Sequence, residues 1–514
     1  MTARPPETPR PDGDADWDAD WDAFRAVRDW PDAAAPADVS VQGVNLGHAT
    51  RRATMLAVAA AVRREAFPGQ AAREAAFRTA WGLTATSGGS GAAWAQAGLA
   101  GLRALPDRLA LGRMARQQRQ GAGTPLLLVK DTRRLRPLMA HLHNARFLRM
   151  HTGLGTQGGG AVPVAPGPSW RRGVPDGFRD ALAAGLAAGL AARGLDLDAA
   201  ALDAIVGEAA REAARVRVLN RVFDRLRPAA VVLHDDTSPE GLTVALTAAA
   251  RGLPAVTLAH GLDCERFFLD AVYARFKCVW GPARAATITA TGAGDPAALR
   301  VTGNPGHDGL DMPRAPALGG DTWLWVTRPH VSRKAFQPSR FVHEGADILA
   351  ALLDTLKHHP TATLTVKPHP TDYADVYARQ VADSGLGARV HIRHDSLDTL
   401  LPRARVVISE DSTAALDACL AGKPLIHSHF APAPPALPLV EYRAALPGGD
   451  AAALADSLGR LDALADGTAT DPDLARHLFE GQRAFIAAHA GPLDGQAGAR
   501  VRAVLDEAIA TFNV

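Results

Sequence analysis

Two series of short apolar strands that alternate with helical segments constrain the fold more than any other feature of this chain. The first series includes "AAVVLHD" (229–235), "PEGLTVALTAAARG" (239–252) and "PAVTLA" (254–259), and the second runs from "TWLWVTR" (322–328) to "KPLIHS" (423–428). Strands separated by helices are typical of βαβ units, whose strands form parallel sheets. A Pro/Gly-rich joint, "MPRAPALGGD", separates the two series. The sequence therefore predicts an α/β fold with two doubly wound Rossmann-like domains that face a cleft.

The predicted domain boundaries follow the changes of pattern along the 514 residues. The polar, acidic and Pro-rich start of the chain predicts a disordered tail over residues 1–35. A helical N-terminal region is expected at 36–120, an N-terminal Rossmann-like domain at 121–312, a C-terminal Rossmann-like domain at 320–495, and a C-terminal helix at 496–514.

Composition excludes several functional classes. The formal net charge of +2 gives no support for a nucleic-acid partner, which usually meets a concentrated basic surface. Cys264, Cys278 and Cys419 are far apart, without the spacing of a metal site or the density of a disulfide scaffold. The apolar stretch 181–195 is shorter than the roughly 20 residues that span a bilayer, and the polar start does not resemble a signal peptide. We expect a cytoplasmic protein.

Polar side chains follow nearly every predicted strand at its carboxyl end, which is where open parallel sheets bind ligands. Those of the first series are His234, Asp235, Asp236, His260, Gly261 and Asn304. Those of the second series are Arg328, Lys334, Lys367, His369, Glu410, Asp411, Ser412 and Thr413. Their recurrence at the same end of successive strands, in both series, favours one shared site.

Each of these positions also has a purely structural interpretation. Ser412 lies where a helix begins and is a typical N-cap residue, and an acidic pair before a helix complements its dipole. His369 lies between two prolines and is also explained as part of a rigid loop. The run "HDD" (234–236) imitates a metal-binding motif. The sequence leaves these alternatives open.

The ordered set "VVLHDDTSPEGL … LAHGL … VTGNPGHD … VKPHP … ISEDSTAALDACLAGKPLI" resembles the two-Rossmann-domain (GT-B) glycosyltransferase superfamily over residues 225–440. The most similar branch comprises bacterial capsule and surface-polysaccharide glycosyltransferases, which are related to UDP-N-acetylglucosamine 2-epimerases. The resemblance implies an enzyme that moves a sugar from a nucleotide-sugar donor to a glycan or lipid-linked acceptor. It also implies no bound metal and no cofactor, since the nucleotide sugar is a substrate.

The resemblance also implies roles for single residues. In this superfamily the C-terminal domain holds the donor and the N-terminal domain holds the acceptor. Donor binding is expected from Arg328, Lys334, Lys367, His369, Glu410, Asp411, Ser412, Thr413 and Asp417. Acceptor binding is expected from His234, Asp235, Gly261 and Asn304. The predicted catalytic residues are Asp236 or His260 as the base that deprotonates the acceptor, and His369, which compensates charge on the leaving phosphate.

Two other functions compete with this hypothesis. A 2-epimerase is one, but its Ser-Gly-Gly-x-x-Glu-Glu run is replaced here by "DSTAALDA". An inactive GT-B scaffold in a polysaccharide assembly complex is the other, and the polar residues at the strand ends weigh against it. The Arg/Ala-rich helices of 50–120 either hold a lipid-linked acceptor at the membrane surface, as a peripheral association, or are ordinary domain helices.

Overall fold

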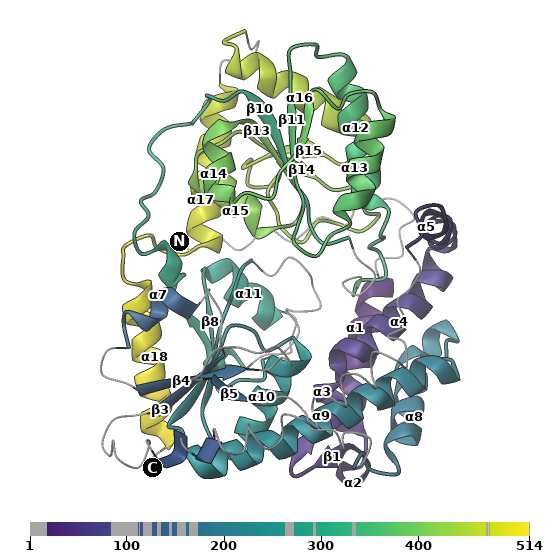
Figure 1. Cartoon of the computed structure of the whole chain (residues 1–514), viewed down its shortest axis with the longest axis vertical. Coiled ribbons are helices and arrows are strands. Elements are labelled where there is room, and N and C mark those ends of the chain that lie inside the picture. The colour runs from purple at the N-terminus through teal and green to yellow at the C-terminus, as the bar shows by residue number, and fades with distance from the viewer. Residues whose placement is uncertain are drawn as a thin grey trace.

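A computed structural model (Figure 1) describes most of the chain. The described residues are 18–83, 111–112, 114–116, 126–130, 135–142, 146–151, 161–163, 173–262, 272–290, 295–330, 336–468, 471 and 473–512.

A seven-stranded parallel sheet forms the core of the N-terminal domain. Its strand order is β5-β4-β3-β6-β7-β8-β9, and every neighbouring pair is parallel. The strands are β3 (Leu126–Lys130), β4 (Arg146–His151), β5 (Ala161–Pro163), β6 (Ala230–Leu233), β7 (Ala255–Leu258), β8 (Phe276–Val279) and β9 (Leu299–Val301).

A second, six-stranded parallel sheet forms the core of the C-terminal domain. Its order is β12-β11-β10-β13-β14-β15. The strands are β10 (Thr322–Val326), β11 (Leu364–Lys367), β12 (Val390–Ile392), β13 (Ala404–Ser409), β14 (Leu425–Ser428) and β15 (Leu446–Gly448). Numbered along the chain, the C-terminal sheet follows the order 3-2-1-4-5-6 of the doubly wound fold, and the N-terminal sheet follows the same order with a seventh strand beyond the sixth. The order reverses between β10 and β13, and ligands bind at such a switch point.

Apolar helix faces cover both sides of the C-terminal sheet. On one side β10 and β11 pack with α12 (Glu344–Lys357), α13 (Ala374–Asp383) and α16 (Ala451–Ala465). On the other side lie α14 (Leu397–Leu400), α15 (Thr413–Leu420) and α17 (Leu474–His489). Gly422, at φ +64°, ends α15 in the left-handed conformation that favours glycine, and Pro424 follows before β14.

The last helix returns to the N-terminal domain. The helix α18 (Ala497–Phe512) packs with α7 (Arg136–Met139) on one face of the N-terminal sheet. The long α9 (Ala199–Leu226) and α10 (Pro239–Ala250) cover the opposite face. Another helix of this domain, α11 (Pro282–Ala290), contacts α17.

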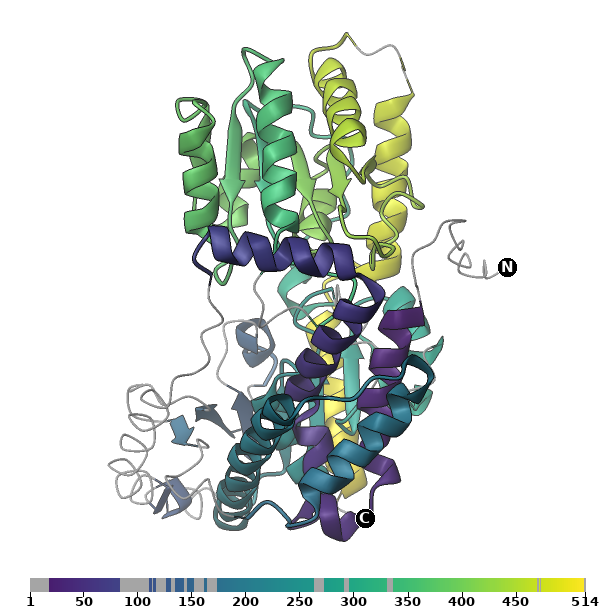
Figure 2. The ribbon, with the colours of Figure 1, turned by 90° about the vertical axis from the view of Figure 1, so that its right-hand side faces the viewer.

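The N-terminal extension is a helical layer with its own apolar core. It comprises α1 (Asp18–Ala33), α2 (Pro36–Val39), the short β1 (Ser40–Val41) and β2 (Val44–Asn45), α3 (Leu46–Ala49), α4 (Arg51–Ala66) and α5 (Pro68–Ala80), together with α8 (Phe178–Leu190) and α9. Figure 2 shows α5 lying across the end of the C-terminal domain. The helices α4 and α5 contact that domain through Arg63 and Gln70.

The predicted disordered tail over 1–35 is wrong for residues 18–33, which form α1. Phe24, Val27 and Trp30 of this helix are buried against α4 and α8, so the acidic composition concealed an apolar face. Residues 1–17 and 84–110 lie outside the described residues, so the predictions for them stay predictions.

The predicted fold class is confirmed: the protein is α/β, with two doubly wound Rossmann-like domains and a helical N-terminal extension, the GT-B arrangement. Among the described helices, none combines the length and apolar character that crossing a membrane requires.

Candidate functional site

The carboxyl ends of the two sheets meet at the start of α15. The Leu262 N–H, just after β7, donates a 3.1 Å hydrogen bond to Thr413 Oγ1. A Cβ on the neighbouring Gly261 would lie 2.5 Å from the same oxygen, so only glycine fits this approach. The predicted acceptor residue Gly261 and the predicted donor residue Thr413 are therefore in contact.

Ser412 is the N-cap of α15. Its hydroxyl accepts a hydrogen bond from the Ala414 N–H at 3.2 Å, which confirms the capping interpretation of this residue. The unpaired N–H groups and positive dipole end of such a helix also attract anions. Ser412 and Thr413 are half-buried, at the edge where the two domains meet.

Glu410 follows β13 and is only 1% exposed. Its Oε2 accepts a 3.1 Å hydrogen bond from the Arg328 backbone N–H and faces His330 Nε2 at 2.9 Å. Burial alone would raise the pKa of Glu410, but the charge and hydrogen bond of His330, together with Arg328, lower it. Burial would lower the pKa of His330, but the charge and hydrogen bond of Glu410 raise it. Glu410 thus joins the ends of β10 and β13.

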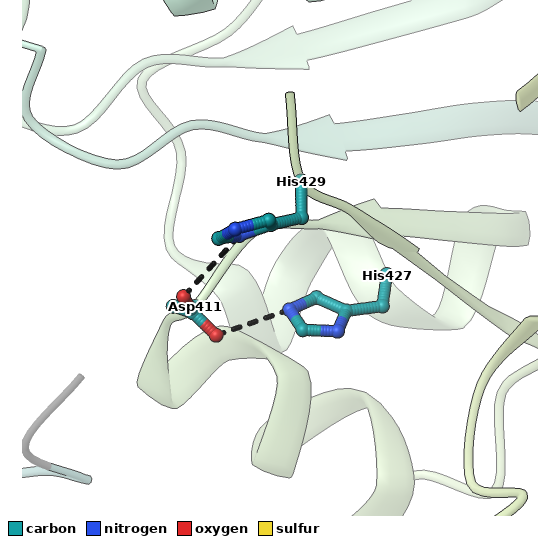
Figure 3. Close-up of side chains that lie close together, drawn as sticks. All are labelled: Asp411, His427 and His429. Atoms are coloured by element: carbon teal, nitrogen blue, oxygen red, sulfur yellow. Dashed lines mark hydrogen bonds and ion pairs between the residues drawn. The ribbon is translucent and has the colours of Figure 1, made fainter. Parts of the chain in front are cut away.

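Asp411 is also buried, between β13 and β14 (Figure 3). It forms an ion pair with Arg340, lies 3.1 Å from His427 Nε2, and accepts backbone hydrogen bonds of 3.0 Å from Ala436 and Leu437. Burial would raise its pKa, but the hydrogen bonds of His427 and His429 and the charge of Arg340 hold it well below the ordinary value. The structure thus places both predicted donor-binding acids, Glu410 and Asp411, inside the protein, where partners from distant segments orient the loop before α15.

The loop that carries His369 is fixed by Thr327, which follows β10. The His369 N–H donates to Thr327 Oγ1 at 2.9 Å, and the Thr327 hydroxyl donates to Asp372 at 2.6 Å. The Thr371 N–H donates to His369 Nδ1 at 3.2 Å. Since a backbone N–H can only donate, Nδ1 is the acceptor and Nε2 carries the proton of the neutral ring. The rigid-loop interpretation is confirmed by these contacts.

The other predicted donor residues differ in their placement. Arg328 is buried beside Glu410, so its charge acts on that carboxylate. Lys367 is half-buried at the end of β11. Asp417 is half-buried on α15, and burial, with a contribution from Asp398, raises its pKa to about 6. Lys334 lies outside the described residues.

Asp236 is a buried ion-pair partner in the N-terminal domain. Its Oδ1 lies 3.1 Å from the Lys277 ammonium, and the side chains of both residues are at most 3% exposed. Its Oδ2 is buried without a hydrogen-bond partner among the described residues. A carboxylate in this position stabilises Lys277 and is poorly placed to reach a substrate hydroxyl.

His260, in contrast, is exposed at the end of β7. Its Nδ1 lies 3.2 Å from the His234 carbonyl oxygen, which accepts the Nδ1 proton, so Nε2 carries the lone pair of the neutral ring. The rings of His234 and His260 meet edge to face at 5.7 Å. His234 Nε2 in turn lies 3.0 Å from Asp235, which also accepts from the Ser238 N–H at 2.8 Å.

The remaining predicted acceptor residue, Asn304, caps a short turn. Its side-chain oxygen accepts from the Gly306 N–H at 2.9 Å. This hydrogen bond gives Asn304 a structural role in the turn and does not link it to the other predicted acceptor residues.

Sequence reasoning missed five residues of this site: His330, Arg340, Glu344, His427 and His429. Each is buried or nearly so and contacts one of the two acids after β13 or its partner Arg340. Two groups of them bring candidate metal-ligand atoms within 4.8 Å of one another: Asp411 with His427 and His429, and His330 with Glu344 and Glu410. The only available signal was "HSH" (427–429) at the end of a strand.

A hollow of about 430 Å³ lies between α5 and the C-terminal domain, behind Glu344. None of the predicted site residues lines it. Its walls include Arg73, Phe341, His343, Asp347 and Phe430.

No protein-family model and no curated protein sequence matches the chain. Solved structures similar to it include the S. aureus MnaA-UDP co-structure (14% identity, 74% of this chain, 95% of that chain, TM-score 0.46). A putative UDP-N-acetylglucosamine 2-epimerase from Listeria monocytogenes is also similar (16% identity, 75% of this chain, 96% of that chain, TM-score 0.47). So is a glycosyltransferase from Rickettsia africae (10% identity, 75% of this chain, 99% of that chain, TM-score 0.43). These values are too low to support any conclusion about activity.

Proposed function

We propose that the protein is a GT-B glycosyltransferase that moves a sugar from a nucleotide-sugar donor to a glycan or lipid-linked acceptor in surface-polysaccharide biosynthesis. The observation that carries this proposal is the contact between the loop of His260, Gly261 and Leu262 and the start of α15. This contact brings His260, at the carboxyl end of the N-terminal sheet, towards the N-terminus of α15, which lies at the switch point of the C-terminal sheet.

The donor phosphates bind at the start of α15. There the helix dipole and the N–H groups compensate phosphate charge, and Thr413 Oγ1 exchanges its contact with Leu262 for the nucleotide. His369 Nε2–H supplies a further donor as charge develops on the leaving phosphate. Side chains and a helix dipole act here in place of a catalytic metal ion.

The acceptor hydroxyl is deprotonated by His260. Its exposed ring and the lone pair on Nε2 support this role, whereas Asp236 is enclosed with Lys277. Ring orientation by the His234 carbonyl fixes the tautomer that a general base needs. We place the reaction in the cytoplasm, and the buried free thiols of Cys278 and Cys419 support a reducing compartment.

A thermal-shift titration with CMP, UDP, GDP and ADP, with and without magnesium, tests the donor site. A ligand that binds only the folded chain raises the melting temperature once its concentration passes its dissociation constant. We expect one nucleotide to do so without magnesium. No shift with any of the four would contradict the proposal.

The double variant Ser412→Ala, Thr413→Ala tests the position of the phosphates. It should weaken the binding of that nucleotide about tenfold or more, because two polar side chains at the helix start are removed. Asp450→Ala is the matched control, since Asp450 is an exposed N-cap of α16 in the same domain. Equal nucleotide affinity in wild type and double variant would place the phosphates elsewhere.

Product analysis separates transfer from epimerisation. An epimerase changes UDP-N-acetylglucosamine in the absence of any acceptor. The transferase proposed here leaves the nucleotide sugar intact until an acceptor is added, and acceptor-independent epimerisation would overturn it.

A further inference from the structure

The helical extension packs on the N-terminal domain and also reaches the C-terminal domain. Its apolar core includes residues of α9, the helix that covers one face of the N-terminal sheet. Figures 1 and 2 show α4 and α5 running from this layer to the C-terminal domain. There they meet the segment 336–343, which precedes α12. The extension therefore links the two domains independently of the chain segments that join them.

Two charged side chains of the extension hold this segment. Asp20 of α1 accepts hydrogen bonds from the Ser339 N–H at 3.1 Å and from the Ser339 hydroxyl at 2.6 Å. Arg63 of α4 donates to the carbonyl oxygens of Pro338 at 3.0 Å and Gln337 at 2.9 Å. All five residues are buried. Because hydrogen bonds to charged groups are strong, they fix the segment against α1 and α4.

The next residue, Arg340, joins the held segment to the loop before α15. Its guanidinium pairs with Asp411 and lies 3.6 Å from Glu344 Oε2. Glu344 Oε1 in turn accepts a 2.6 Å hydrogen bond from the Phe341 N–H. The side chains of Arg340, Asp411 and Glu344 are at most 7% exposed. A buried ion pair thus transmits the position of the segment to Asp411.

Asp411 lies directly before Ser412, the N-cap of α15. In the described part of the chain, no hydrogen bond or ion pair joins Arg340 to Ser412 or Thr413. Any effect of Arg340 on the start of α15 therefore acts through the Asp411 carboxylate.

We propose that Arg340 is a positioning residue of the donor site, and that the extension holds it in place through Asp20 and Arg63. The role rests on the proposed function, in which the donor phosphates bind at the start of α15. N–H groups at a helix start bind phosphate only when they are directed at it, and a misplacement of about 1 Å costs as much as about 100-fold in rate. Arg340 orients the residue before the N-cap and so fixes that direction.

The start of α15 is held by the N-terminal domain along two routes. The direct route is the hydrogen bond from the Leu262 N–H to Thr413 Oγ1, which the bound nucleotide replaces in the proposed function. The indirect route runs through the extension, Arg340 and Asp411, and it leaves the helix start free for the ligand. The extension thus keeps the loop in place when Thr413 turns to the nucleotide.

Nucleotide affinity of folded variants tests the role. Dissociation constants for CMP, UDP, GDP and ADP are measured by calorimetry at a temperature where circular dichroism shows each variant to be folded. In Asp20→Ala we expect the nucleotide that wild type binds to be held about tenfold more weakly, although Asp20 is remote from the ligand in sequence and lies on another domain. Wild-type affinity in folded Asp20→Ala would overturn the role.

Asp462→Ala is the matched control. Asp462 accepts from Trp323 Nε1 at 3.0 Å and from Arg405 Nε at 2.9 Å, near the beginnings of β10 and β13 and so at the opposite end of these strands from α15. It should lower the melting temperature and leave nucleotide affinity unchanged. An equal loss of affinity in this control would reduce the effect of Asp20 to general destabilisation.

Substitutions of Arg340 test the ion pair itself. Arg340→Gln should weaken nucleotide binding at least as much as Asp20→Ala, because Asp411 loses its guanidinium. Arg340→Lys retains a positive charge beside Asp411 and should recover part of the loss. Wild-type affinity in folded Arg340→Gln would contradict the role.

Hydrogen exchange of the chain without nucleotide separates this role from the proposed function. The N–H groups of residues 411–416 should exchange faster in Asp20→Ala than in wild type or Asp462→Ala. Unchanged exchange there would overturn the role whether or not a nucleotide binds. Faster exchange in a protein whose wild type binds none of the four nucleotides would overturn the donor site and still show that the extension holds this loop. Should Asp20→Ala not fold, Ser339→Ala, which removes only the hydroxyl donor, takes its place.

Discussion

Asp20 Oδ2 accepts a 2.6 Å hydrogen bond from the Ser339 hydroxyl, although 319 residues separate the two in the chain. The same carboxylate accepts from the Ser339 N–H and from Gln337. From α4, Arg63 donates to the carbonyl oxygens of Gln337 and Pro338. The helical extension thus holds the segment that leads to Arg340, the ion-pair partner of Asp411.

Replacing Asp20 should loosen this attachment. Asp20→Ala leaves buried donors without an acceptor, and we expect the free energy of unfolding to fall by about 2–4 kcal/mol. Urea denaturation measures the loss, and hydrogen exchange should increase in residues 336–341. Asp29→Ala is the control, because Asp29 lies on the same helix with its side chain 59% exposed. Equal stability of the two variants would show that the contact contributes nothing.

Neutralising Asp411 should destabilise the C-terminal domain. Asp411→Asn removes the partner of a buried guanidinium, a loss of about 3–5 kcal/mol at neutral pH. Because the pKa of Asp411 is held well below its ordinary value, its contribution is fully present above the unfolded-state pKa. It is lost as the pH falls through the lower, folded-state value. Denaturation of both proteins from pH 7 down to pH 3 should show the difference shrinking only at the acidic end, and a constant difference would contradict this.

Asp417 should have the opposite effect. Its pKa is raised to about 6, so the folded chain binds a proton that the unfolded chain has released, and stability falls as the pH rises from about 4 to 6. Asp417→Asn removes this penalty, which is on the order of 2–3 kcal/mol. We expect a higher melting temperature for the variant at pH 7.5 and no gain near pH 4. A variant less stable than wild type at pH 7.5 would mean that the carboxylate has a favourable partner.

The two candidate bases should respond differently to substitution. His260→Asn should keep its stability and its nucleotide binding while transfer falls about 100-fold or more. Asp236→Asn should instead lower the free energy of unfolding by about 3 kcal/mol, because it leaves Lys277 buried without its counter-charge. Transfer assays and denaturation curves of the two variants separate the roles. Full activity of His260→Asn would return the base to Asp236.

The grouping of the candidate residues at the strand ends was predictable from the sequence, but their burial and partners were not. The polar residues that follow each strand can be read directly from the sequence, and a Ser at a strand–helix junction indicates a helix N-cap. Glu410 and Asp411 look like surface acids in the sequence, yet both are buried. Their partners His330, Arg340 and His427 come from other segments, and nothing in the neighbouring residues indicates that pairing.

The alternation of apolar strands and helices by itself determined two parallel sheets, because each strand buries both faces under helices. It also determined that the polar residues share one edge of each sheet. Only the tertiary structure decided which of them reach solvent. It placed Asp236 with Lys277 in the interior, left His260 exposed, and turned the acidic start of the chain into the buried helix α1. Burial and ion pairing depend on which distant segments pack together, and a local pattern does not encode that.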